Sequence, residues 1–333
     1  MKDKYIIPIF ISHKGCPNQC TFCNQRKISG SLGDINTCDI KLEIEKYIQL
    51  YKKNNLPIEI AFFGGSFTGI ELQTQEELLK LANIYIEKRL VESIRISTRP
   101  DYINSEILDM LKKYNVKTIE LGIQSMDTEV LLEAKRGHTA QDVINACNLI
   151  NNYKFDLGVQ MMIGLNKSTL EKEIKTCKEL INLNPKIARI YPVLVIKDTQ
   201  LSEQYRIGEY KALSLDEAIY RSKEVLKLFR TNNVNVIRIG LQATDNISEG
   251  NDVIAGPFHP AFGELVESEI IYDDVCNYIK RNNINSQELK IYVNPKCVSV
   301  FVGNKRKNII RIKEKFNVTI KLIQDNNVYK YNF

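Results

Sequence analysis

Three cysteines with short spacing are the residues of this sequence best suited to chemistry. Cys16, Cys20 and Cys23 form a CxxxCxxC pattern within GCPNQCTFCNQ, directly after an apolar stretch near the start of the chain. Thiolates are the usual protein ligands of iron–sulfur clusters, and three ligands leave one iron of a 4Fe–4S cluster open. Structural zinc sites instead have four protein ligands. No fitting second cysteine pair is present, although His13 is a possible fourth ligand, so the pattern favours a cluster over zinc.

Strand and helix patterns alternate along the first 240 residues. Apolar stretches typical of buried strands cover residues 5–11, 58–63, 93–98, 117–123, 155–164, 188–196 and 234–240, with helical spacing between them. This alternation predicts an α/β fold with a parallel sheet covered by helices. About six units fit, so we expect a partial (βα)6 TIM-like barrel over residues 1–240. The cysteine loop would follow its first strand, at the end where barrel active sites lie.

The cysteine loop and its placement resemble the radical S-adenosylmethionine (SAM) superfamily. The resemblance implies that Cys16, Cys20 and Cys23 bind a 4Fe–4S cluster whose open iron chelates the amino and carboxylate groups of SAM. An electron from the cluster would then break a C–S bond of SAM and release a 5′-deoxyadenosyl radical. Phe22, the aromatic residue before the last cysteine, would lie near the adenine. A reductant such as flavodoxin or ferredoxin would be a partner.

Further segments match the SAM-binding motifs of this superfamily in the right order. Gly64, Gly65 and Ser66 end the second strand and resemble the motif whose backbone groups bind the SAM amino nitrogen, since glycine lets a ligand approach the backbone closely. Gln124, in ELGIQS, resembles the residue that binds the ribose hydroxyls. Arg136, in KRGHT, resembles the arginine that pairs with the SAM carboxylate, a geometry that suits a guanidinium group.

Three other polar residues of these segments depart from the superfamily motifs or have two readings. Gln160 stands where relatives often carry a ribose-binding acid, and its amide could serve instead. Ser97, in STRPD, stands where related sequences often have a glutamate for the SAM amino group, so another group would supply that bond or SAM is held more loosely. His138 has either a structural role or a contact with substrate.

The segments GGSFTG, STRPDYI, ELGIQS, AKRGHT, GVQMMIGL and RIYPVLVIKDTQL together resemble the elongator catalytic subunit family, over about residues 6–240. That family modifies the wobble uridine of tRNA with a radical SAM domain fused to an acetyltransferase domain. About 90 residues follow the barrel, so we expect no acetyltransferase domain in this chain. Arg189 and Tyr191, near the end of the last long strand, either pack inside the barrel or contact substrate.

The C-terminal extension, residues 241–333, changes from acidic to basic along its length. From about residue 286 the pattern of strand, short helix, turn, helix and strand resembles a KH domain, in which a GxxG loop binds a nucleic-acid backbone. The loop here runs from Gly303 to Arg306, so the second glycine is an arginine. This module either binds RNA or is a solvated basic cap. The preceding segment, residues 256–268, reads as a loop over the barrel mouth, with His259 and Glu264 as possible substrate contacts.

The composition indicates a cytoplasmic protein. The start of the chain does not read as a signal peptide, no stretch approaches the ~18 apolar residues of a membrane span, and eight cysteines in such a chain do not form a disulfide framework.

The favoured function is a radical SAM enzyme that modifies tRNA, in the manner of a transferase. The alternatives are a radical SAM enzyme with a small-molecule or protein substrate, and a non-catalytic iron–sulfur or nucleic-acid binding protein.

Overall fold

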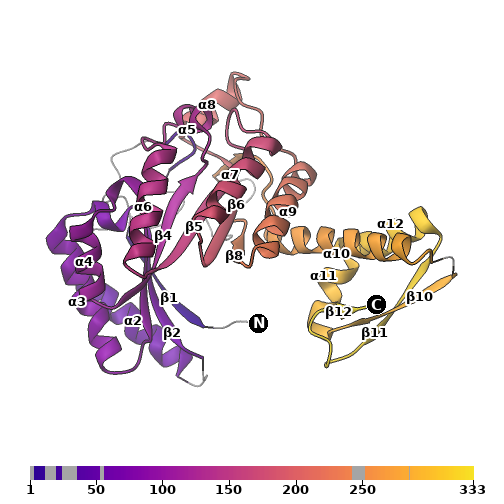
Figure 1. The fold of residues 1–333 in the computed structure, drawn as a ribbon, viewed down its shortest axis with the longest axis horizontal. Helices are drawn as coiled ribbons and strands as arrows, with labels where there is room; N and C mark the ends of the chain where they lie inside the picture. Colours follow the sequence, from indigo (N-terminus) through magenta and orange to yellow (C-terminus); the bar gives the residue numbers. More distant parts are fainter. Residues whose placement is uncertain (1–3, 12–19, 25–35, 53–55, 242–251, 285) are drawn as a thin grey trace. The chain divides into compact units, whose positions relative to one another are not determined.

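The computed structural model describes residues 4–11, 20–24, 36–52, 56–241, 252–284 and 286–333 (Figure 1). The chain forms two compact units. The first, the barrel unit, comprises Met1–Leu213 and Val225–Phe258, and the second, the C-terminal unit, comprises Ser214–Glu224 and His259–Phe333. None of the helices in the described ranges is long and apolar enough to cross a membrane.

One curled sheet of seven strands is the centre of the barrel unit. Its order is β1-β2-β3-β4-β5-β6-β8, and each neighbouring pair is parallel. The sheet is a half-barrel (Figure 1), which confirms the predicted partial TIM-like α/β barrel. The strands are β1 (Tyr5–Ile11), β2 (Ile58–Gly64), β3 (Ser93–Thr98), β4 (Val116–Gln124), β5 (Asp156–Ile163), β6 (Ile187–Pro192) and β8 (Asn235–Ile239).

Most of the helices between the strands pack on one face of this sheet, and successive strand side chains point alternately to this face and to the opposite one. The covered face is apolar: Ile60, Phe62, Ile94 and Ile96 are at most 1% exposed. The opposite face carries charged side chains, described below. The helices are α2 (Thr37–Tyr51), α3 (Leu72–Glu87), α4 (Ser105–Lys113), α5 (Thr128–Glu133), α6 (Ala140–Asn152), α7 (Leu170–Asn182), α8 (Gln200–Arg206) and α9 (Leu215–Thr231).

Two stretches differ from the sequence prediction. Residues 188–196 are not one strand: β6 ends at Pro192, and β7 (Val195–Ile196) pairs antiparallel with β9 (Val253–Ala255). Proline has no N–H to continue a ladder, which accounts for the break. Residues 256–268 are not a loop throughout, because α10 (Phe262–Arg281) begins within them. Its buried side chains, such as Val266 and Val275, recur at helical spacing.

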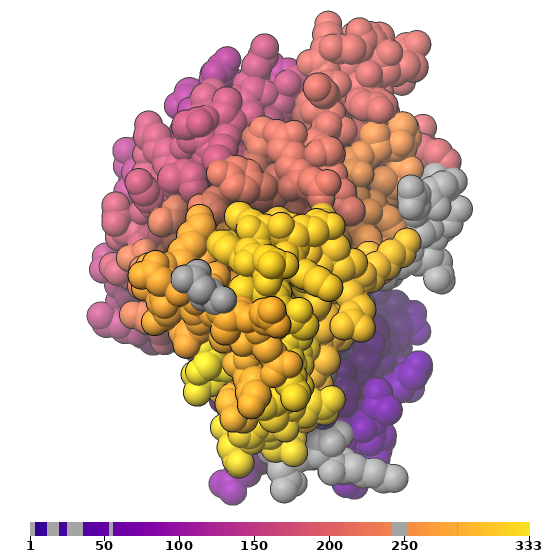
Figure 2. Space-filling model, turned by 90° about the vertical axis from the view of Figure 1, so that its right-hand side faces the viewer, coloured from indigo at the N-terminus to yellow at the C-terminus, as the bar shows by residue number. Residues whose placement is uncertain are grey.

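The C-terminal unit is a small α/β module, as predicted. Its sheet has the order β11-β10-β12, with β10 (Glu288–Val293) parallel to β11 (Thr319–Gln324) and antiparallel to β12 (Tyr331–Asn332). The helices α10, α11 (Val298–Val302) and α12 (Lys307–Phe316) pack against it around a core that includes Val275, Ile291, Phe301 and Ile312. Figure 2 shows one face of the part of this unit that follows residue 259, in orange to yellow.

Candidate active site

Two of the three motif cysteines lie in the described segment 20–24. Cys20 is 4% exposed and Cys23 is half-buried, whereas Cys16 and His13 lie outside the described residues. The backbone of Thr21 fixes the segment: its N–H donates to the carbonyl of Ala134 at 3.1 Å, and its carbonyl accepts from the N–H of Leu201 at 2.7 Å. The cysteine segment is therefore attached to the end of α5 and the start of α8.

Arg136 joins the cysteine segment to the end of the sheet. Its Nη1 donates to the Sγ of Cys20 at 3.2 Å, across 116 positions of sequence, and its Nη2 donates to the carbonyl of Gly122 at 2.5 Å. Arg99 donates to the carbonyl of Arg136 at 2.8 Å and so holds the turn that carries it. The buried Nε of Arg136 has no hydrogen-bond partner in the described part of the chain. Arg136 thus offers a donor atom for a ligand beside a cysteine sulfur.

Gly64 occupies a position that only glycine fits. Its φ is +99°, and a Cβ built there would lie 2.6 Å from the carbonyl oxygen of Ile11. The N–H of Gly65 donates to the same oxygen at 3.0 Å. These contacts hold the end of β2 against the end of β1, which leads into the cysteine loop.

The hydroxyl of Ser66 is engaged inside the protein. Its Oγ lies 2.7 Å from Oγ1 of Thr98 and accepts from the N–H of Arg99 at 3.3 Å. Thr98 also lies 2.6 Å from the hydroxyl of Thr68. This hydroxyl network ties the turn after β2 to the end of β3, so a ligand at the turn would meet backbone rather than the serine side chain.

Gln124 and Gln160 lie side by side on β4 and β5. Nε2 of Gln160 donates to Oε1 of Gln124 at 3.2 Å. Gln124 has a positive φ of 74° and is 5% exposed. A Cβ on Gly122 would lie 3.1 Å from Nη2 of Arg136 and 3.2 Å from Nε2 of Gln124, so a larger residue here would press on both side chains. The two amides and Arg136 therefore share one end of the sheet.

Phe22 and Ser97 lie near the same ends of the strands. Phe22 packs with Tyr191 against an apolar group that includes Ala134 and Met162. Ser97 is half-buried on β3.

His259, in the C-terminal unit, accepts a hydrogen bond at Nδ1 from the N–H of Ala261 at 3.1 Å, just before α10 begins.

His138 is a buried neutral imidazole. It is 5% exposed, and neither ring nitrogen has a hydrogen-bond partner within the described residues. Burial, and then the charges of Arg136 and Arg99, lower the pKa of His138 to about 4. The residue lies beside a cavity of about 440 Å³ lined by residues 128, 131–132 and 135–140. An unpaired imidazole here could donate one hydrogen bond and accept another.

Sequence reasoning missed a chain of buried ion pairs on the charged face of the sheet. We call Glu59, Arg95, Glu120 and Arg189 the ion-pair ladder. Arg95 binds Glu59 at 2.6 Å and also pairs with Glu120, and Nε of Arg189 donates to Glu120 at 2.6 Å. Burial acts to raise the pKa of Glu120, but Arg189 and Arg95 outweigh it and hold that pKa below its ordinary value. The sequence signal that could have revealed these ion pairs is a glutamate within an otherwise apolar strand, as at Glu59 and Glu120.

Arg189 connects this ladder to the end of β6. Its Nη1 donates to the hydroxyl of Tyr191 at 3.1 Å. Burial opposes the charge of Arg189, yet the nearby Glu120 carboxylate raises the pKa of Arg189 above its ordinary value. The guanidinium is thus permanently charged and held at two edges.

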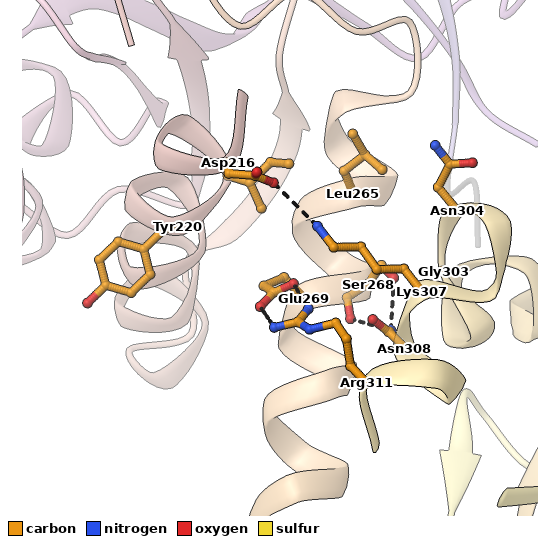
Figure 3. Close-up of a pocket in the computed structure, with 11 residues that line it drawn as sticks. Asp216, Tyr220, Leu265, Ser268, Glu269, Gly303, Asn304, Lys307, Asn308 and Arg311 are labelled. Atoms are coloured by element: carbon orange, nitrogen blue, oxygen red, sulfur yellow. Dashed lines mark hydrogen bonds and ion pairs between the residues drawn. The ribbon is translucent and has the colours of Figure 1, made fainter. Parts of the chain in front are cut away.

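The C-terminal unit has a pocket of about 360 Å³ beside its glycine loop (Figure 3). Figure 3 shows charged side chains paired across it: Lys307 lies 3.4 Å from Asp216, and Arg311 binds Glu269 at 2.7 Å. Arg306, which replaces the second glycine of the loop, has a φ of 61°. The loop backbone therefore keeps a glycine-like conformation and adds a cation.

Some basic residues of this unit are paired with carboxylates and others are not. Lys307, Arg311, Lys321 and Lys330 each lie within 4.0 Å of a carboxylate. No ion pair within this distance occurs, in the part of the chain that the structure describes, for the exposed residues Lys296, Lys305, Arg306 and Lys313. These four charges are available to a polyanion.

Comparison with known proteins identifies the class that this half-barrel and its cysteine segment define. The Radical SAM superfamily matches residues 10–180, and the Radical_SAM C-terminal domain matches residues 185–272. The chain belongs to the radical SAM superfamily. Membership gives it the cofactors of that superfamily, a 4Fe–4S cluster and SAM.

Relatives place the chain near the elongator proteins. It is 28% identical to the tRNA uridine(34) acetyltransferase of Methanocaldococcus jannaschii over 69% of this chain and 50% of that protein. It is 29% identical to Elongator complex protein 3 of Saccharomyces cerevisiae over 51% of this chain and 34% of that protein. The structure of Methanocaldococcus infernus Elp3 with an N-terminal deletion shares the fold, with a TM-score of 0.64 and 23% identity over 86% of this chain and 65% of that chain. The chain spans about half the length of the tRNA uridine(34) acetyltransferases it matches.

The residues present fit both cofactors. The sulfur of Cys20 faces a guanidinium donor, which suits a sulfur that carries negative charge as a metal ligand. The free buried Nε of Arg136 and the Gly64 turn, which has no room for a Cβ, suit a carboxylate and a closely approached backbone.

Proposed function

We propose that this chain is an enzyme that reductively cleaves SAM and uses the resulting radical to modify tRNA. The observation that carries the proposal is the contact of Arg136 with Cys20 at 3.2 Å. It brings the arginine of the KRGHT segment to the cysteine segment, as a shared site for cluster and SAM requires.

The bound cluster would supply the electron that breaks a C–S bond of SAM. Cys16, Cys20 and Cys23 would hold it, leaving one iron for SAM. Arg136 would bind the SAM carboxylate through its free Nε, and Phe22 would pack near the adenine. Fixed donors of this kind place the bond that breaks close to its electron source.

The turn formed by Gly64, Gly65 and Ser66 would bind the SAM amino group through backbone carbonyls, because the N–H of Gly65 and the hydroxyl of Ser66 are already engaged. Gln124 and Gln160 would bind the ribose hydroxyls, since paired amides present both donors and acceptors.

The tRNA substrate is proposed from the relatives and from charge. The M. jannaschii relative is named a tRNA uridine(34) acetyltransferase. The exposed cations Lys296, Lys305, Arg306 and Lys313 of the KH-like module, which have no ion pair among the described residues, suit phosphate contacts. A reductant such as flavodoxin or ferredoxin would deliver the electron.

The first test is SAM cleavage. The protein is reconstituted with iron and sulfide under anaerobic conditions, reduced with SAM present, and assayed for 5′-deoxyadenosine. We expect product from the parent chain and from Cys38→Ala, which removes an exposed cysteine outside the motif, but none from Cys20→Ala. A cluster-loaded parent that makes no product even with bulk tRNA would refute the proposal.

The second test is RNA binding. Affinity for bulk tRNA should fall steeply with salt, because phosphate neutralisation releases counterions. Lys305→Ala together with Arg306→Ala should weaken binding and reduce the salt slope by about 2. The control is Lys321→Ala, which removes a lysine 3.9 Å from Glu288. No tRNA binding at low salt would remove tRNA as the substrate.

A further inference from the structure

Two phenylalanines lie at the ends of neighbouring strands, next to the proposed SAM turn. Phe10 and Phe63 are paired in the β1–β2 register, one residue before Ile11 and Gly64. Their ring centroids lie 6.2 Å apart with an interplanar angle of 43°. Phe10 is 50% exposed, although it is a large apolar side chain within a strand. This pair presents apolar ring surface to solvent.

The position of Arg189 shows which face of the sheet carries this pair. Its guanidinium carbon lies 5.2 Å from the ring centroid of Phe63. Arg189 is on β6 and Phe63 on β2, four places apart in the strand order. Side chains so far apart along the sheet meet only across the inside of its curl. Phe63 and Arg189 therefore face the interior of the half-barrel, at the end where SAM would bind.

The contacts of Arg189 indicate what this surface binds. The Arg189 guanidinium donates twice to Glu120, at 2.6 and 3.1 Å, and a further edge faces the Tyr191 hydroxyl. These edges are engaged, so a ligand would meet the faces of the guanidinium and of the phenylalanine rings. A flat ring with polar edges fits such a surface, because it can stack on aromatic and guanidinium faces and hydrogen-bond at its rim.

We propose that Phe10, Phe63, Arg189 and Tyr191 form a nucleobase-binding surface, against which one unpaired base of the RNA substrate stacks inside the half-barrel. This inference rests on the proposed function and adds the part of the RNA that enters the site. An RNA base that leaves its stack and binds to this surface would lie beside the proposed SAM site. It would then be within reach of a radical formed from SAM.

The test pairs a protein change with an RNA change. Cluster-loaded protein with SAM is titrated with a short RNA hairpin that has one uridine in its loop, and with the same hairpin made abasic at that uridine. The parent should bind the intact hairpin about 5- to 100-fold more tightly, since a stacked base contributes roughly that factor. Phe10→Leu keeps an apolar side chain but removes the ring, so it should abolish most of this preference. Phe10→Tyr should retain it.

Leu42→Ala is the matched control, because Leu42 is an exposed apolar residue on α2 and is 64% exposed. It should leave the preference unchanged, and iron content and unfolding temperature check that each variant is intact. Equal loss of affinity for both hairpins in Phe10→Leu, or a parent that does not distinguish them while it binds RNA, overturns the nucleobase surface and leaves the proposed function standing. A parent that binds neither hairpin nor bulk tRNA overturns both.

Discussion

Glu120 should be among the most costly residues of the barrel unit to neutralise. It is 5% exposed, accepts two hydrogen bonds from Arg189, at 2.6 and 3.1 Å, and pairs with Arg95. Removing one partner of a buried ion pair costs about 3–5 kcal/mol, because the remaining charge is buried without compensation. Arg95 keeps Glu59, and the Arg189 side chain is 15% exposed. We therefore expect the lower end for Glu120→Gln, about 3 kcal/mol.

The assay is urea unfolding followed by far-ultraviolet circular dichroism, with the midpoint and slope compared between variants. The double variant Glu120→Gln with Arg189→Met should recover part of the loss, because it removes both unmatched groups together. Glu92→Gln breaks an exposed pair with Lys117 and should cost less than about 1 kcal/mol. A loss below about 1 kcal/mol for Glu120→Gln, or strictly additive losses in the double variant, would refute the reasoning.

Three further predictions use the same protein. Below pH ~6.5 the unfolded chain protonates His138 while the folded protein, with a pKa of about 4, does not, so stability should fall by about 2 kcal/mol between pH 7.5 and 5 and His138→Gln should flatten the profile. Gly64→Ala should lower the free energy of unfolding by about 2 kcal/mol or more in urea. Gly208→Ala should lower it by only about 1 kcal/mol, because φ is +82° there but no atom beyond the chain neighbours lies within 4 Å of an added Cβ. Equal losses for the two variants would contradict this. Burial raises the pKa of Cys147 to about 12, so iodoacetamide at pH 8 should label the exposed Cys38 and spare Cys147, as peptide mass spectrometry would show.

The strand–helix alternation was sufficient to predict the half-barrel, because each strand carries its own apolar signal. The KH-like pattern likewise predicted the order of helices and strands after β10. The strand break at Pro192 and the helical start at Phe262 were missed, although the proline and the helical spacing of the apolar residues in α10 were local signals for them. The pairing of β7 with β9 was not predictable in this way, because it depends on a tertiary partner that local periodicity does not contain.

The candidate site was predictable in its motif residues but not in its supporting residues. Cys20, Gly64 and Arg136 stand in recognisable motifs, and the structure brings Arg136 to Cys20. Their roles toward SAM stay predictions. The contact of Arg189 with Glu120 joins strands 69 residues apart in sequence, so spacing could not reveal it. Glu120 was visible only as a charge inside an apolar strand.

The ion-pair ladder also has a consequence for folding. It draws one charged residue from each of β2, β3, β4 and β6, all on the face opposite the helices. Shifting any of these strands by one position would turn its Glu or Arg into the apolar layer beneath the helices and expose an isoleucine or leucine instead. Such a misaligned sheet would bury an unmatched charge at a cost of several kcal/mol. The ladder therefore selects the correct alignment of the strands, and with it the alignment of the turns that follow them.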